Sequence, residues 1–374
     1  MPDKTALVLG GGGARAAYQV GVLKAVVQNY PRNHGVPFKI ICGTSAGAIN
    51  GTSIATHASC FHLGVRKLEW VWRHFNTHKV YRSSFGGIFS HMLQMMIMGL
   101  QDEKINPEAG SLFNNEPLRE LLNELINFAR IDRNIANGAL DALCVDTSCY
   151  NSSRSVSFFQ AQHDIDEWVR ARRGGQRTHL NTEHLLASSA IPLVFPSIKL
   201  NRGYYGDGSV HQLAPLSSPI HLGAEKIMVI NLDSPHKQVH QELEHHPKTA
   251  TIAGHLLDTI FSDTLNSDLE RLQRINATLQ LIPEQKRAES PLKTIETLVI
   301  KPSQDLSLIA AQHFHDMPLA VRLLLRLIGI NQQSDSSIVS YLLFEQSYCS
   351  ALINLGYLDG MTQMDEIKHF FKLD

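Results

Sequence analysis

Acidic residues are absent from a long N-terminal stretch of this chain. No Asp or Glu occurs between Lys4 and Leu68, although seven Lys and Arg residues lie there. The rest of the chain balances this excess, and the net charge is −1, which gives no indication of a nucleic-acid partner. A basic lobe of this kind would attract an anionic substrate or surface. Scattered, solvated side chains are the alternative interpretation.

Cysteines are few, and long apolar runs are missing. The five cysteines have neither the spacing of a disulfide framework nor that of a metal site, so we expect reduced thiols and no metal. No apolar run reaches the roughly 20 residues that span a bilayer. The first strand is expected to begin at Thr5, which leaves no room for a secretory leader. We therefore expect a cytoplasmic chain that is at most peripheral to a membrane.

The N-terminal third alternates between strand-like and helix-like segments. An apolar strand is predicted at Thr5–Leu9, followed by glycines and a helix over residues 14–30. A second strand, Phe38–Cys42, leads into a Gly-containing turn and a helix that ends near Ser59. This rhythm predicts an α/β fold with a mostly parallel central sheet flanked by helices.

The remaining segments continue this pattern and then change character. The predicted elements are a partly helical stretch at 70–99, helices at 117–130 and 182–189, strands near 139–145, 155–160 and 226–232, and a hairpin at 197–205. A polar, His-rich segment at 233–248 is interpreted as a linker. We therefore expect one domain over residues 1–235. Residues 236–374 are expected to form a mainly helical extension, with one strand at 294–300, that caps the groove or builds an oligomer interface.

Gly43-Thr44-Ser45-Ala46-Gly47 is the most informative motif in the sequence. A G-x-S-x-G turn between a strand and a helix holds its serine on a sharp bend with an exposed hydroxyl. The flanking Gly43 and Gly47 leave room for two elements to approach closely. The motif predicts that Ser45 is a nucleophile, and a plain β–α turn is the alternative.

The glycine run after the first strand has two interpretations. Residues 11–16 fit the dinucleotide pattern G-x-G-x-x-G/A. A dinucleotide site also needs an acidic residue about 20 positions later, and the acid-free stretch offers none. The amides of Gly11, Gly12 and Gly13 would serve equally well as donors to an oxyanion beside Ser45. Arg15 could hold a phosphate, support the loop or face solvent.

A serine nucleophile needs a base, and the sequence offers more than one. Asp207 lies in the tight turn Gly206-Asp207-Gly208-Ser209 that follows a predicted strand. Asp-Gly is also a common turn dipeptide. A Ser-Asp-His triad with His211 or His221 has a known chain order as well. Sequence order leaves both a dyad and a triad open.

Taken together, three stretches resemble the patatin-like phospholipases. Leu7–Arg15, Gly43–Gly47 and Asp207–Ser209 follow one another in the order and rough spacing of that family. Segments 110–118 and 187–196 are similar to it too. The resemblance covers about residues 5–235 and rests on three separate motifs in register.

The resemblance assigns roles to particular residues. It implies that Ser45 is the nucleophile and that Asp207 is its only side-chain partner. It also implies an oxyanion-binding loop of five neighbouring residues, Gly11, Gly12, Gly13, Ala14 and Arg15. Two positions depart from the family pattern. Ala16 stands where glycine is usual, and Ser209 stands where glycine or alanine is usual. Both substitutes are small, so we expect altered loop packing and not loss of the site.

The expected activity is hydrolysis of fatty-acyl esters of phospholipids or lysophospholipids through an acyl-enzyme at Ser45, without a metal or cofactor. Two alternatives stay open: a carboxylesterase acting on soluble esters, and a non-catalytic lipid-binding module with the same fold. The Met-rich segment 92–98 suits an acyl groove or ordinary core packing. The Leu-rich segment 318–330, with Arg322 and Arg326, is compatible with membrane contact or with a homo-oligomer interface.

Overall fold

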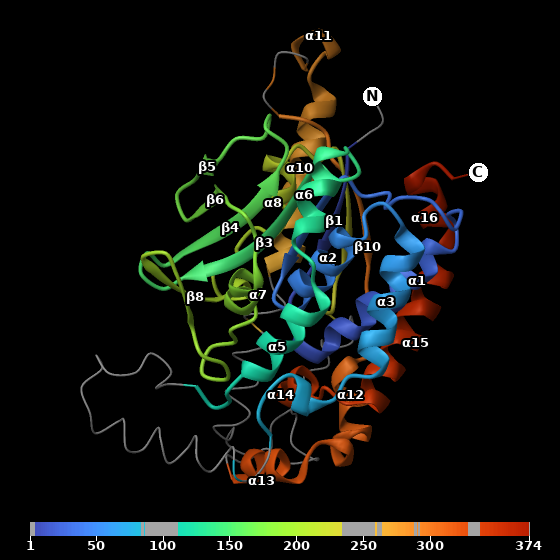
Figure 1. The fold of residues 1–374 in the computed structure, drawn as a ribbon. Helices are drawn as coiled ribbons and strands as arrows, with labels where there is room; N and C mark the ends of the chain where they lie inside the picture. Colours follow the sequence, from blue (N-terminus) through green and yellow to red (C-terminus); the bar gives the residue numbers. More distant parts are fainter. Residues whose placement is uncertain are drawn as a thin grey trace, which may run out of the picture.

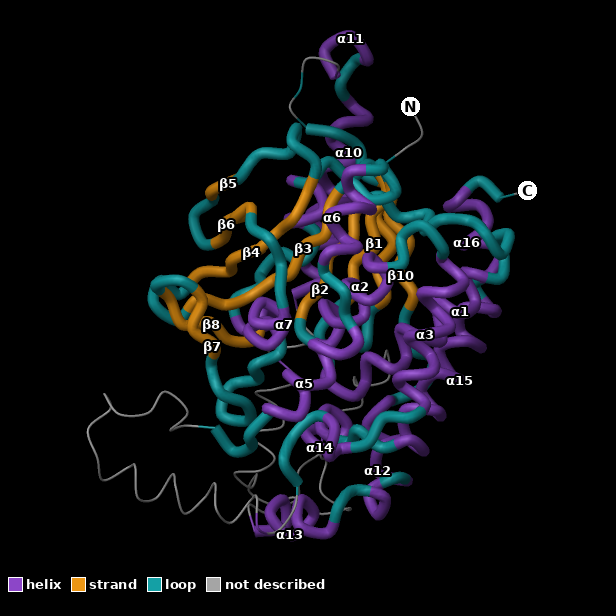
Figure 2. The backbone as a smooth tube through the Cα atoms, viewed as in Figure 1, coloured by secondary structure: helices purple, strands orange, loops and turns teal. Residues whose placement is uncertain are grey.

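The computed structural model describes residues 4–83, 86, 111–233, 259, 264–287, 290, 292–327 and 337–373. The Met-rich segment 92–98 and all but the first residue of the predicted linker lie outside these ranges. The described chain forms a central sheet with helices on both faces, as Figures 1 and 2 show. The predicted α/β fold with a mostly parallel sheet is confirmed.

Five strands form the parallel part of the sheet, in the spatial order β10-β9-β1-β2-β3. Their bounds are Glu296–Ile300, Lys226–Ile230, Thr5–Leu9, Ile40–Thr44 and Ala142–Cys149. The four strands from β9 to β3 are buried along their whole length, because helices cover both faces. The carboxyl ends of these strands meet at one edge of the sheet, where ligands bind in open α/β folds.

Strands of mixed direction extend the sheet beyond β3. β4 (Arg154–Ala161) runs beside β3, followed by β6 (Arg173–Arg177) and the short β5 (Trp168–Val169). The predicted hairpin is formed by β7 (Ile198–Leu200) and β8 (Gly203–Asp207), and β8 pairs with the end of β3. The sequence did not predict β5 or β6.

The two faces of the sheet carry different helices. Leu7 and Leu9 of β1 belong to a large core that includes α1 (Ala17–Val27), α2 (Ala46–Thr56) and α3 (Phe61–Arg73). Ala6 and Val8 of the same strand face a smaller core beneath α8 (Ser217–His221) and α10 (Thr264–Leu281). This alternation follows from the two-residue period of a strand.

Several predicted helices have other bounds. The helix predicted over 14–30 consists of η1 (Gly13–Ala16) and α1. The helix predicted over 117–130 is two helices, α5 (Glu116–Leu125) and α6 (Ala129–Ala136), because Ile126 adopts an extended conformation after α5. α3 begins at Phe61, nine residues before the predicted start at 70, and η2 (Thr77–Lys79) follows it. α7 (Thr182–Ser188) ends one residue before its predicted end.

The C-terminal region packs directly onto this core. Besides α10, its described helices are α11 (Glu284–Arg287), α12 (Leu306–Gln312), η5 (Phe314–Asp316), α13 (Leu319–Leu327), α14 (Ser337–Leu342), α15 (Gln346–Thr362) and α16 (Met364–Phe371). The predicted strand at 294–300 is β10, which pairs with β9. The domain boundary at residue 235 stays a prediction.

α15 lies along α1 at close range. A Cβ on Gly21 would lie 2.0 Å from the Ile353 carbonyl oxygen, and one on Gly356 would lie 2.1 Å from the Tyr18 carbonyl oxygen. The Tyr18 hydroxyl also donates to Asp359 Oδ2 at 2.9 Å. Glycine on both helices therefore permits an approach that any side chain would prevent. Within the described residues, no helix has the length and apolar character needed to cross a bilayer.

Candidate active site

Ser45 lies on a strained turn between β2 and α2. Its φ of 55° and ψ of −130° are unusual for a residue with a side chain, and the residue is only 1% exposed. A Cβ on Gly43 would lie 2.5 Å from the Ala48 Cα, and a Cβ on Gly47 would lie 2.3 Å from the Leu9 carbonyl oxygen. Glycine at both positions therefore allows β1, β2 and α2 to meet around the serine.

Asp207 is the last residue of β8 and is completely buried. Its Oδ1 accepts a hydrogen bond from the Ser209 amide at 3.0 Å. Burial raises the pKa of the Asp207 carboxyl to about 6, although the nearby Ser45 hydroxyl and the Ser209 hydrogen bonds act to lower it. The Oδ2 atom has no hydrogen-bond partner of ordinary geometry among the described residues. Catalytic hydrogen bonds in ligand-free sites are often long or poorly aligned in this way.

The sheet register brings Ser45 and Asp207 together. Thr44, the residue before Ser45, lies opposite Asp146 of β3, and Asp207 lies opposite Thr147 of the same strand. β4 pairs with β3 along its whole length, so β2 and β8 share the opposite edge of β3 and meet end to end there. Because Thr147 directly follows Asp146, Ser45, which follows Thr44, comes close to Asp207.

The end of α7 and the residues just after it support both Ser45 and Asp207. The Ser45 amide donates to Ser188 Oγ at 2.8 Å, and this hydroxyl donates to the Asp146 carbonyl at 2.6 Å. The Asp207 amide donates to the Ala190 carbonyl at 2.9 Å. The sequence singled out residues 187–192 only by their resemblance to a family. Nothing in the local pattern indicated that Ser188 would hold the turn.

The glycine loop after β1 lies against the Ser45 turn. A Cβ on Gly47 would approach the Gly10 carbonyl oxygen to 2.6 Å, and Gln19 Nε2 donates to that oxygen at 2.8 Å. Gly13 has a positive φ of 54° and borders the same cavity as Ser45. The glycine loop and the first turn of α2 thus border the same space as Ser45. Peptide amides at the start of a helix or in a glycine loop can stabilise an oxyanion.

Arg15 is buried and points toward the C-terminal region. Its guanidinium donates to Ser340 Oγ at 2.7 Å, to the Tyr341 hydroxyl at 3.0 Å and to Ser307 Oγ at 2.9 Å. It also lies 4.0 Å from the centre of the Tyr341 ring, and only 4% of the residue is exposed. Of the three roles that the sequence left open for Arg15, these contacts favour support of the loop that contains Ala14. The guanidinium does not face solvent.

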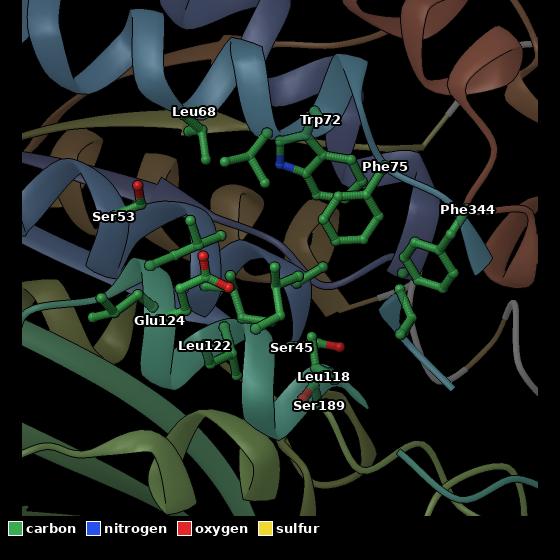
Figure 3. A pocket seen from close by; sticks show the side chains of 18 of the residues that line it. Ser45, Ser53, Leu68, Trp72, Phe75, Leu118, Leu122, Glu124, Ser189 and Phe344 are labelled. Atoms are coloured by element: carbon green, nitrogen blue, oxygen red, sulfur yellow. The ribbon is translucent and has the colours of Figure 1, made fainter. Parts of the chain in front are cut away.

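A cavity of about 350 Å³ opens beside Ser45. Figure 3 shows Ser45 and Ser189 toward one end and Ser53 and Glu124 toward the other. Most of the wall is apolar and comes from α2, α3, α5 and later segments, including Ile49, Leu68, Trp72, Leu118, Leu122 and Phe344. The site therefore combines a serine, a buried carboxylate and a long apolar space.

The two histidines considered from sequence have other contacts. His221 stacks on Trp168 and bonds the Ser217 carbonyl at 2.8 Å. Burial lowers the pKa of His211, whose Nδ1 has no hydrogen-bond partner among the described residues. Neither ring bonds Ser45 or Asp207 in that part of the chain, so the geometry favours a serine–carboxylate pair. The same residues contain no group of three or more metal-binding side chains.

Comparison with known proteins adds an independent observation. A family model described as patatin-like phospholipase matches residues 7–220, more than half of the 374-residue chain. Over 66 residues, the chain is 45% identical to patatin-like phospholipase domain-containing protein 7 of Rattus norvegicus. The matched segment covers 18% of this chain and 4% of that protein. Over 67 residues, it is 54% identical to lysophospholipase nte1 of Aspergillus terreus, with the same two shares, 18% and 4%.

The chain thus spans only a small part of the length of these curated relatives, about 4%. Among solved structures, VipD from Legionella pneumophila is similar, with a TM-score of 0.41 and 12% identity. That match covers 98% of this chain and 67% of VipD.

Proposed function

This chain belongs to the patatin-like phospholipase family, and on that premise we propose that it is a serine acyl hydrolase acting on phospholipids or lysophospholipids. One observation carries the proposal. Ser45 stands on a strained turn at the end of an apolar cavity, beside the buried carboxyl group of Asp207. Nucleophile, base and space for a lipid chain therefore occur together.

The proposed reaction has two halves. Asp207 accepts the Ser45 hydroxyl proton while Oγ attacks the ester carbonyl carbon, and the resulting oxyanion is bound by amides of the Gly11–Gly13 loop and of α2. The C–O bond to the leaving alcohol then breaks, and that alcohol takes the proton from Asp207. In the second half, Asp207 deprotonates a water molecule that attacks the acyl carbon, the bond from that carbon to Ser45 Oγ breaks, and Oγ takes the proton back from Asp207 as the fatty acid leaves.

The raised pKa of Asp207, about 6, suits this role. A carboxylate with an ordinary pKa near 3.9 is a poor base for an alcohol. Burial makes Asp207 more basic while leaving it ionised at neutral pH. The oxyanion donors supply a further part of the rate, because loss of one such donor typically costs about 100- to 1,000-fold in turnover.

Three features support a lipid as substrate. The cavity wall is mostly apolar, the N-terminal stretch lacks acidic residues that would repel a phosphate, and one relative is named a lysophospholipase. Residues 1–235 would supply the reacting groups. Residues 236–374 would act as a cap, since Phe344 lines the cavity and Ser340 holds Arg15. The proposal also includes a cytoplasmic location, contact with a membrane surface and assembly into a homo-oligomer.

A lipid panel with a Ser45→Ala control tests the proposal. We expect the wild-type protein to release fatty acid from phospholipids or lysophospholipids and to react with a fluorophosphonate probe, and the variant to do neither. A folded wild-type protein that hydrolyses no ester and leaves Ser45 unlabelled would favour a lipid-binding module. Faster hydrolysis of monomeric than of micellar esters of equal chain length would favour a soluble carboxylesterase.

A further inference from the structure

The cavity beside Ser45 follows one face of α2. Ala46, Ile49, Ser53 and His57 all line it, and their spacing of three or four residues puts them on the same side of the helix. His57 is the C-cap residue of α2, twelve positions beyond Ser45. At 1.5 Å per residue, the lined face is about 18 Å long. The part of the cavity that follows α2 is therefore a channel of defined length that runs from the candidate nucleophile to His57.

The character of the wall changes along this channel. Beyond Ser45 the helices α3 and α5 contribute apolar side chains such as Leu68 and Leu122. At the other end, Ser53 and His57 stand beside the exposed Lys67 and Glu124, which also line the cavity. An apolar channel thus ends in a polar group of side chains.

His57 is the most unusual member of that polar end. The residue is only 5% exposed, and its Nε2 has no hydrogen-bond partner among the described residues. Its Nδ1 contacts the Ser53 carbonyl at 3.0 Å, and burial lowers the pKa of the ring. A neutral imidazole that donates from Nδ1 leaves the lone pair of Nε2 unsatisfied.

Two independent estimates give the capacity of the channel. An extended chain advances about 1.3 Å per carbon for carbon–carbon bonds of about 1.5 Å, so about 18 Å accommodates about 14 carbons. A methylene fills about as much space as a water molecule, roughly 30 Å³. The cavity of about 350 Å³ would therefore hold about 12. Length and volume agree.

We propose that α2 measures the acyl chain of the substrate. The ester carbonyl lies at Ser45, the chain runs past Ile49, and its methyl end stops at Ser53 and His57, so that acyl groups of about 12 to 14 carbons fit best. The inference rests on the proposed acyl hydrolase function. It adds a preference for acyl groups of a certain length, which the proposed hydrolase function does not specify.

The rate constant should depend on chain length in a characteristic way. Each methylene that enters the apolar part of the channel contributes about three- to fourfold to kcat/KM. The increase should stop when the chain reaches the polar end, because further methylenes find no apolar wall. We therefore expect a break in kcat/KM at about 12 to 14 carbons in a series from butyryl to stearoyl p-nitrophenyl esters, presented in mixed micelles of fixed composition.

A Ser53→Phe substitution tests the assignment. Position 53 is eight residues, or about 12 Å, from Ser45, so a phenyl ring there should move the break to about nine carbons. Ser59→Phe is the matched control, because Ser59 is exposed and lies outside the cavity lining. We expect the control to keep the wild-type break.

A second variant covers the case in which Ser53→Phe does not fold. Ile49→Phe puts the obstruction about 6 Å from Ser45 and should move the break to about five carbons. Active variants with the wild-type break, or a wild-type profile without a break, would overturn the inference while the hydrolase function stands. Absence of Ser45-dependent hydrolysis at every chain length would instead reject the proposed function.

Discussion

Asp207 is subject to two opposing influences on its charge. Burial disfavours the carboxylate, whereas the nearby Ser45 hydroxyl and the hydrogen bond from the Ser209 amide favour it, and the pKa is raised to about 6. If this group is the base, kcat/KM should rise with pH, with a midpoint near 6, and be lost below it as the carboxyl becomes protonated. A pH–rate profile with a soluble ester measures this.

Asp207→Asn provides the control for that profile. The variant should lose roughly 1,000-fold or more in kcat/KM and show no midpoint near 6. His211→Ala should keep the wild-type profile. A variant at His211 that lost activity to the same extent would contradict the serine–carboxylate pair.

The same pKa has a consequence for stability. The folded pKa of about 6 exceeds the ordinary value of 3.8, so the protonated form is favoured in the folded state. Its stabilising contribution is complete below pH 3.8 and is lost as pH rises through 6. Asp207→Asn should therefore raise the free energy of unfolding by up to about 3 kcal/mol at a pH well above 6. Thermal unfolding at two pH values would reveal a smaller gain at the acidic one.

Ser188 is predicted to position the nucleophile. Ser188→Ala leaves the buried Ser45 amide without its acceptor, which should cost about 1–3 kcal/mol of stability. We expect kcat to fall about tenfold with little change in KM, because the turn that presents Ser45 loses its support. Ser59→Ala, an exposed serine, serves as the control. An unchanged kcat would mean that the turn keeps its geometry through its glycines alone.

At the scale of elements, the contact between α1 and α15 depends on glycine. Gly21→Ala would bring a methyl group to 2.0 Å from the Ile353 carbonyl oxygen. We expect the variant to lose about 1–3 kcal/mol in urea denaturation, since overpacking of a core costs about that much. At Gly10 a Cβ would meet no atom within 4 Å, so Gly10→Ala should lose much less. Equal losses would show that the helix contact is not the cause.

Buried strands were the elements that sequence predicted best. β1 occupies Thr5–Leu9 as expected, because a short apolar run that ends at glycines is typical of a strand covered on both faces. β6, Arg173–Arg177, contains two arginines, two glycines and a glutamine, so no hydrophobic alternation indicated it. The start of α3 at Phe61 was missed although apolar residues recur at helical spacing along it.

The candidate site likewise contains residues that the sequence indicated and residues that it did not. Ser45 and the glycines around it form a local pattern whose geometry follows from the turn itself. The support from Ser188 and from Ser340 depends on contacts across 143 and 325 residues. No local periodicity encodes such pairs, because they arise only when the sheet and its helices are assembled. The sequence therefore indicated the candidate reacting groups but not the residues that hold them.

At the scale of the whole molecule, the predicted boundary at residue 235 can be tested directly. A fragment of residues 1–235 would lose β10 beside β9, α15 against α1 and the buried partners of Arg15. We expect this fragment to be insoluble or to lack a cooperative unfolding transition, whereas the full chain has one. A soluble fragment with a cooperative transition would establish an autonomous N-terminal domain.

The hydrogen bonds of Arg15 limit which chimeras between this chain and a relative can fold. Its guanidinium is held by Ser307, Ser340 and Tyr341, and the backbone of Tyr341 lies so near Gly13 that a Cβ there would be 2.3 Å from its carbonyl oxygen. A chimera that joins the first half of this chain to the C-terminal region of a relative would leave the buried Arg15 guanidinium without these hydrogen-bond partners, next to Gly13. Hybrids whose C-terminal part keeps Ser307, Ser340 and Tyr341 should hydrolyse substrate. Hybrids that lack these residues should fold poorly or be inactive.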